Sequence, residues 1–129
     1  MRYLVILIIL LVSVQETTYA QKKSRWFKGN LHTHSYWSDG DDFPEMIMDW
    51  YKRHGYDFVS LSDHNTLGEG VLWKEIPKHP FRQGRFRDYL AKFGADWVTY
   101  RTDSGGVIRV KLKTPAEYRP LFEERNKFL

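Results

Sequence analysis

Cysteine is absent from this sequence of 129 residues. A chain without cysteine forms no disulfides, offers no thiolate for nucleophilic catalysis or metal binding, and has no cysteine that could carry a lipid. The sequence also lacks internal repeats, low-complexity tracts, and any apolar run as long as the ~20 residues of a membrane-spanning helix. These absences exclude a disulfide scaffold, a thiol enzyme and a repeat array, and we expect no stable membrane span.

Blocks of like charge are missing as well. The formal net charge is +4, but the basic residues are interleaved with acidic ones along most of the chain. The one local excess, at Lys22, Lys23 and Arg25, is typical of a solvated tail rather than of a nucleic-acid patch. A nucleic-acid partner is therefore not expected.

The first twenty residues have the pattern of a secretory signal peptide. A basic residue precedes an apolar run from Leu4 to Val12, and a polar stretch then ends at Ala20. This order matches the basic, apolar and cleavage regions of such a peptide. We assign residues 1–20 to a signal peptide and residues 21–129 to one domain, and expect export to the periplasm or the extracellular space. An uncleaved N-terminal anchor is the alternative.

The first half of the domain predicts a strand, a helix and a parallel strand. The predicted first strand ends near Thr33, and the predicted second strand, Phe58–Leu61, is an apolar run typical of a strand buried on both faces. A helix within residues 41–56 connects them. The fold class is therefore α/β, with parallel strands and crossover helices.

The connecting helix has clear start and stop signals. Asp41 or Asp42 is the predicted N-cap, Pro44 lies in the first turn, and Gly55 ends the helix. Apolar residues recur at a spacing of three to four, and we expect Trp50 to pack in the core.

The segments that follow are less regular. Residues 66–84 have glycine and proline at both ends, which predicts a long loop with one turn of helix. Residues 85–93 predict a brief amphipathic helix that ends at Gly94.

A hairpin and a short helix are predicted near the C-terminus. Residues 96–112 alternate on two arms around a turn at 103–106. Thr114 and Glu117 have the spacing of a capping box, so a helix begins there, and Pro120 should shorten or kink it.

Two histidines and an aspartate cluster around the end of the first predicted strand. His32 and His34 are two residues apart, so both side chains point to the same face if the strand persists through them. Asp39 follows in a loop in which Gly40 permits a tight backbone. This arrangement predicts a metal site.

The second predicted strand ends with Asp63 and His64. Because the carboxyl ends of parallel strands lie at the same edge of a sheet, these side chains should converge with those of the first strand. Histidine and aspartate are common metal ligands. His54, in the last turn of the helix, and His79, in a loop, are interpreted as structural or solvated.

The segments "LHTHSYWSDG" and "LSDHN" resemble the first and second signature motifs of the PHP superfamily, the polymerase and histidinol phosphatase domains. The resemblance covers residues 28–65 closely; the remainder is loosely similar to exported PHP-domain proteins of unassigned substrate. It implies the N-terminal part of a distorted β/α barrel, up to three divalent metal ions (zinc, manganese or iron), and phosphoesterase activity.

The resemblance also implies individual roles. His32, His34, Asp39 and His64 match metal ligands, and Asp63 matches an acidic neighbour that ligates the metal or orients His64. The family's downstream ligands, a glutamate, further histidines and a final Asp-x-His, are not identifiable here. We therefore expect the chain to be an N-terminal fragment of the domain, with little or no turnover by itself.

Two functions from different classes follow. The first is a metal-dependent phosphoesterase that hydrolyses a phosphorylated small molecule or another phosphoester with a metal-activated water. The alternative is a secreted binding module with a structural metal, in which aromatic side chains grip a polymer. Its candidate side chains are the five tryptophans, Trp26, Trp37, Trp50, Trp73 and Trp97. The substrate, the metal and the oligomeric state stay open.

Overall fold

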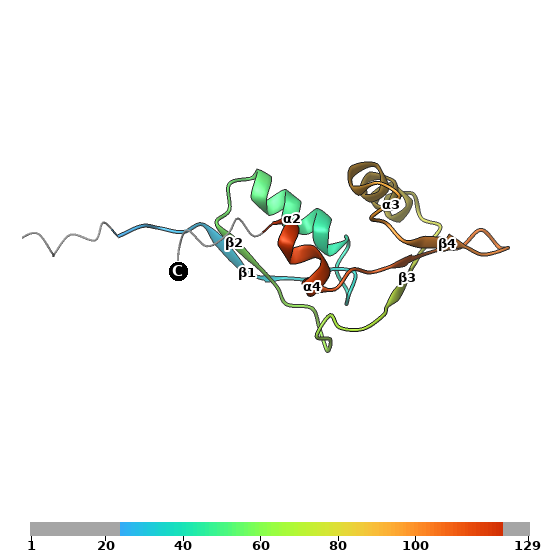
Figure 1. The fold of residues 1–129 in the computed structure, drawn as a ribbon, viewed down its shortest axis with the longest axis horizontal. Helices are drawn as coiled ribbons and strands as arrows, with labels where there is room; N and C mark the ends of the chain where they lie inside the picture. The colour runs from blue at the N-terminus through green and yellow to red at the C-terminus, as the bar shows by residue number, and fades with distance from the viewer. Residues whose placement is uncertain (1–23, 123–129) are drawn as a thin grey trace, which may run out of the picture.

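The computed structural model describes residues 24–122, so the predicted signal peptide lies outside the described residues. Within this range the fold is mixed α/β, with a two-stranded parallel sheet and a three-stranded antiparallel sheet (Figure 1). The sheets of the described part do not close into a barrel, so the predicted barrel remains a prediction. No helix among residues 24–122 is long and apolar enough to cross a membrane.

The predicted strand, helix and strand are confirmed as β1 (Gly29–Thr33), α2 (Pro44–Arg53) and β2 (Phe58–Leu61). β1 and β2 pair in parallel, and α2 lies across them (Figure 1). The register shifts between Asn30 and Thr33. The carboxyl ends of both strands therefore meet at one edge, as a βαβ connection requires.

Helix α2 begins differently from the prediction. Its N-cap is Phe43, with an extended backbone and no side-chain cap, rather than Asp41 or Asp42. Phe43 is completely buried, so the core fixes the start of the helix. The Asp42 carboxylate accepts a hydrogen bond from the Phe43 amide and pairs with Arg85. The expectation that Trp50 packs in the core is wrong, because 46% of its surface is exposed.

The parallel sheet is more exposed than predicted. Phe58 in β2 is 44% exposed, and Leu31 in β1 is 74% exposed. The prediction that the Phe58–Leu61 strand is buried on both faces is therefore wrong for the described part of the chain. Helix α2 covers one face, and neither β1 nor β2 contributes a residue to the buried hydrophobic cluster.

The antiparallel sheet contains β3 (Trp73–Ile76), β5 (Ile108–Lys111) and β4 (Tyr100–Thr102), in that order. The hairpin of β4 and β5 is confirmed. Strand β3 corrects the prediction of a loop across residues 66–84. Its four residues are too few for a clear alternation, and their partner strand is distant in the sequence.

Helix α3 (Pro80–Phe93) packs against this sheet and begins at Pro80 rather than at Arg85. The capping box at α4 (Pro115–Tyr118) is confirmed, and the 3-10 turn η2 (Arg119–Leu121) follows at once. Pro120 lies in η2, as expected for a residue that interrupts an α-helix.

The hydrophobic core lies between α3, the antiparallel sheet and the loop after β1. Three of its buried aromatic residues, Tyr36, Trp37 and Phe43, come from that loop. Phe43 stacks on Tyr89 of α3, with ring centroids 4.0 Å apart. The hydrophobic core beside the antiparallel sheet thus holds this loop in place, although the loop follows a strand of the parallel sheet.

Candidate metal centre

The loop of residues 34–43, here called the site loop, is folded by its own backbone. The amides of Ser38 and Gly40 both donate to the carbonyl oxygen of Ser35, each over 3.0 Å. A Cβ at Gly40 would lie 2.3 Å from the carbonyl oxygen of His34. Only glycine permits this close approach, which agrees with the interpretation of Gly40 from the sequence.

Asp63 ties the site loop to the end of β2. Its carboxylate accepts hydrogen bonds from the Ser35 amide, the Ser35 hydroxyl and the Ser38 hydroxyl, each over 2.7 Å. Both carboxylate oxygens are engaged in this way. Asp63 therefore positions the loop that carries Asp39, whereas the sequence led us to expect it to ligate the metal or to orient His64.

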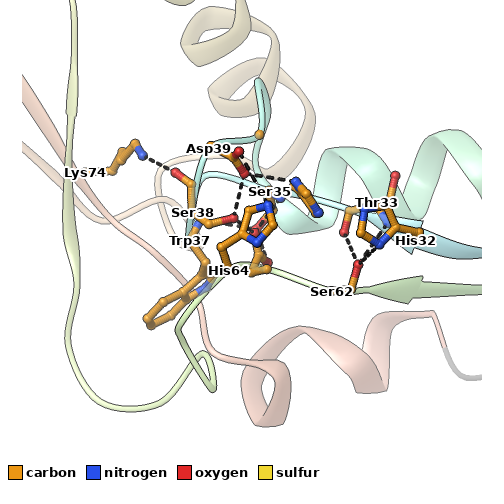
Figure 2. A network of polar contacts seen from close by, with 12 residues as sticks. His32, Thr33, Ser35, Trp37, Ser38, Asp39, Ser62, His64 and Lys74 are labelled. Carbon is orange, nitrogen blue, oxygen red and sulfur yellow. Dashed lines mark hydrogen bonds and ion pairs between the residues drawn. The ribbon is translucent and has the colours of Figure 1, made fainter.

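His34, Asp39 and His64 converge at this edge of the parallel sheet, and Figure 2 shows Asp39 and His64 there. One potential ligand atom of each residue lies within 4.8 Å of the others. His34 Nδ1 is 2.9 Å from Asp39 Oδ1, and His64 Nε2 is 3.7 Å from Asp39 Oδ2. The two imidazole ring centroids are 4.2 Å apart. Three of the four residues predicted as ligands thus form one cluster.

His32 lies beside this cluster but outside it. Its ring centroid is 4.6 Å from that of His34, and its Nδ1 is 3.1 Å from the Ser62 hydroxyl. β1 ends at Thr33, so His34 lies beyond the strand that contains His32, and the register of β1 with β2 is irregular. A ligand role for His32 stays a prediction.

Asp39 is suited to hold a cation. Partial desolvation raises the pKa of its carboxyl group, but hydrogen bonds from the backbone and Ser38, together with the charges of His64 and His34, hold the pKa below its ordinary value. The carboxylate is therefore ionised at neutral pH, which is the form that binds metal.

The chemistry of the cluster fits a divalent metal. Two imidazoles and one carboxylate form a common ligand set of catalytic zinc sites, in which a fourth position stays open for water or substrate. Within the described range of residues 24–122, His34 Nε2 is buried without a hydrogen-bond partner, although buried polar atoms normally have one. An ion bonded to either ring nitrogen would fix the orientation of this ring. The residues therefore fit the group that the sequence predicts.

The two remaining histidines are placed elsewhere. His54 is the C-cap of α2, where its Nδ1 is 2.6 Å from the Trp50 carbonyl oxygen. His79 is the N-cap residue of α3 and is exposed. Neither belongs to the cluster of His34, Asp39 and His64.

Several polar residues around the cluster were not recognised in the sequence. Ser35 and Ser38 bind Asp63, Ser62 contacts His32, and the Lys74 ammonium donates to the Ser38 carbonyl oxygen over 2.9 Å. Hydroxyl groups next to predicted ligands were the available signal for the serines. Lys74 gave no signal, because its strand had been interpreted as a loop.

Searches against protein-family models, curated protein sequences and solved structures each found no match to the chain. The resemblance to the PHP superfamily therefore stays a prediction.

Proposed function

We propose that this protein is a metal-dependent phosphoesterase whose metal is held by His34, Asp39 and His64. The observation that supports this proposal is the convergence of three potential ligand atoms within 4.8 Å at the carboxyl ends of two adjacent parallel strands. Ligands of α/β folds bind at this edge. A divalent ion bound there supplies Lewis acidity, which polarises a phosphoryl oxygen and lowers the pKa of water.

The residues of the chain perform distinct tasks in this proposal. His34 and His64 provide neutral nitrogen ligands, and Asp39 provides the negative charge. Asp63 keeps the site loop in place through Ser35 and Ser38, so that the ligands are already oriented before the ion binds. Such preorganisation limits the reorganisation that would otherwise weaken binding and slow catalysis.

The test is the initial rate of p-nitrophenyl phosphate hydrolysis with added manganese or zinc, measured at high protein concentration because slow turnover is expected. The rate of the wild-type protein should be abolished by a chelator and should exceed that of His34→Ala at least about tenfold, the low end for lost metal-site interactions. His54→Ala, a histidine outside the cluster, is the matched control and should retain the wild-type rate. Equal rates together with equal manganese affinities for the wild type and His34→Ala would overturn the proposal.

The alternative is a metal-stabilised binding module. Trp26 is 95% exposed and Trp50 46% exposed, and these two tryptophans are available to a polymer. Trp37 is buried, and Trp97 donates a hydrogen bond to Glu45, so their indoles serve the fold. Metal binding that raises the unfolding temperature without any chelator-sensitive hydrolysis would favour this alternative.

A further inference from the structure

A small pocket of 160 Å³ adjoins the candidate metal centre, between the site loop, β3 and α3. Asp39 forms part of its wall, so the pocket and the cluster share a residue. Two cationic side chains, Lys74 and Arg82, also line it. The volume is about half of the ~300 Å³ at which pockets for drug-sized ligands begin. A small anionic group fits this pocket, whereas most of a larger molecule would remain outside.

Lys74 is a half-buried cation without a carboxylate partner. Among residues 24–122, its ammonium forms no ion pair within 4.0 Å and donates one hydrogen bond, to the Ser38 carbonyl oxygen. Burial, together with the nearby charge of Arg82, lowers its pKa from the ordinary value. A lysine ammonium has three donors, so two of them are available to a ligand.

Arg82 is held in place at the other side of the pocket. Its guanidinium pairs with Asp41 and lies 5.3 Å from the centroid of the Tyr36 ring. Tyr36 also lines the pocket; among residues 24–122 its buried hydroxyl has no acceptor for its proton, and its electrostatic partner is the Arg82 guanidinium. Unpaired buried donors are costly, and they commonly mark a place where a ligand or ion binds.

The pocket becomes cationic when the metal centre is loaded. Lys74 and Arg82 balance the two acidic residues that line it, Asp39 and Glu75, and Arg82 and Glu75 each have a further partner of opposite charge, Asp41 and Arg109. A divalent ion held by Asp39 would add two positive charges, so the loaded pocket would carry an excess of positive charge.

From this arrangement we infer that Lys74, Arg82 and the Tyr36 hydroxyl form the subsite for the phosphoryl group of the substrate, and that the substrate is a phosphomonoester. This inference rests on the proposed function. A terminal phosphate has a second pKa of about 6 and carries nearly two negative charges at neutral pH. A diester carries one charge and would have to place a second ester group in a pocket of this size.

The first experiment measures binding of inorganic phosphate to the manganese-loaded protein by equilibrium dialysis. Lys74→Met and Arg82→Met should each weaken binding about tenfold or more, since hydrogen bonds between charged groups are the strong ones. Two matched controls lie near these residues in the sequence, Lys78 between β3 and α3 and Arg85 within α3. Lys78→Met removes a lysine that also donates to a carbonyl oxygen, and Arg85→Met removes the arginine that pairs with Asp42. Both should bind phosphate within about twofold of the wild type.

The manganese affinity distinguishes a purely structural role of Lys74 from a role in binding phosphate. Lys74→Met should leave the manganese dissociation constant unchanged, and Lys74→Arg, which keeps the charge, should restore most of the phosphate affinity. If Lys74→Met weakens manganese and phosphate binding equally, Lys74 only positions Ser38 and the inference is wrong. The inference would also be wrong if Lys74→Met and Arg82→Met both bound phosphate with the affinity of the wild type.

The substrate class is tested by comparing p-nitrophenyl phosphate with bis-p-nitrophenyl phosphate. Lys74→Met should lower kcat/KM for the monoester more than for the diester, and equal losses would contradict the assignment to monoesters. Failure of this inference is distinguishable from failure of the proposed function. If hydrolysis is chelator-sensitive and depends on His34, but the variants bind phosphate as tightly as the wild type, only the subsite inference is wrong. If phosphate binding depends on Lys74 but no hydrolysis is observed, only the proposed phosphoesterase activity is wrong.

Discussion

The parallel sheet and the antiparallel sheet divide the molecule into two regions of different physical character. The segments that follow β1 and β2 carry the candidate metal centre, and the two strands contribute no residue to the buried hydrophobic cluster. The antiparallel sheet and α3 bury Ile76, Phe86, Tyr89 and Val110 and contribute no residue to the cluster of His34, Asp39 and His64. The candidate site thus lies in the exposed region, and hydrophobic stabilisation is concentrated in the buried one.

The site loop joins the two regions. Its aromatic residues enter the core of the antiparallel region, while Ser35, Ser38 and Asp39 face the parallel strands (Figure 2). A well-packed core therefore positions ligands that their own sheet does not hold firmly. Substitutions on one side of this loop should change stability, and substitutions on the other should change metal binding.

The largest effect is expected from removing an aromatic ring in the buried region. Phe43→Ala should lower the free energy of unfolding by about 3–5 kcal/mol, because Phe43 is fully buried and its ring packs on Tyr36 and Tyr89. Phe58→Ala, the same change in the exposed parallel sheet, should cost about 1 kcal/mol. Urea unfolding of both variants measures the difference, and equal losses would abolish the distinction between the regions.

Asp39→Asn should affect metal binding without affecting stability. The carboxylate is exposed, and asparagine preserves the turn while removing the charge, so the dissociation constant for zinc or manganese should rise about 10–100-fold. The free energy of unfolding of the metal-free protein should change by about 0.5 kcal/mol or less. Asp41→Asn, in the same loop, is the control for the metal titration. An unchanged metal affinity in Asp39→Asn would leave Asp39 as an ordinary turn residue.

Gly40→Ala should disturb both regions at once. The new methyl group would lie 2.3 Å from the His34 carbonyl oxygen and 2.5 Å from the Ser35 amide nitrogen, so the site loop must shift. We expect a loss of about 1–3 kcal/mol in stability together with weaker metal binding. Gly105→Ala, in the hairpin turn, should leave metal binding unchanged. Calorimetric titration and thermal unfolding of the two variants check this, and a normal metal affinity in Gly40→Ala would contradict the coupling.

The smallest effect concerns Glu45, which accepts hydrogen bonds from Tyr89 and Trp97 inside the protein. Burial raises the pKa of this carboxyl group, so the folded state holds its proton at a pH at which the unfolded chain has released it. Stability from this group is therefore lost as the pH rises from its ordinary pKa of about 4.3 through the raised value.

Glu45→Gln removes this titration. The free energy of unfolding of the variant, relative to that of the wild type, should increase as the pH rises across this window. The comparison should therefore favour the wild type most at the acidic end. Urea midpoints measured at several pH values give the difference directly. A difference that is independent of pH would contradict the raised pKa of Glu45.

The sequence predicted the parallel region better than the antiparallel one. The spacing of Pro44 and Gly55 and the apolar run from Phe58 are local signals, and they identified α2 and β2 correctly. Strand β3 depends on pairing with β5, a contact between residues far apart in the sequence, and its four residues show too little periodicity to be recognised. The exposure of Phe58 and Trp50 depends on which elements cover them, and no local pattern contains that information.

The convergence of three residues at the candidate site could be predicted from the sequence, but the residues that support them could not. The histidine spacing and the two strand ends brought His34, Asp39 and His64 to one place, because parallel strands end at a common edge. The bonds of Asp63 to Ser35 and Ser38 and the position of Lys74 require the folded site loop and the missed strand. The contact of His32 with Ser62, which lies on the neighbouring segment of the chain, is likewise a property of the folded strand pair.

The most direct test of the metal centre is anomalous diffraction at the zinc or manganese edge from crystals grown with that ion. We predict an anomalous peak bonded to His34, Asp39 and His64, at roughly 2.0–2.2 Å from each ligand atom for zinc. His32 would either join this set or stay paired with Ser62, and His54 and His79 should bear no peak. Crystals in which Asp39 remains paired with His34, while the ion binds elsewhere or not at all, would contradict the account.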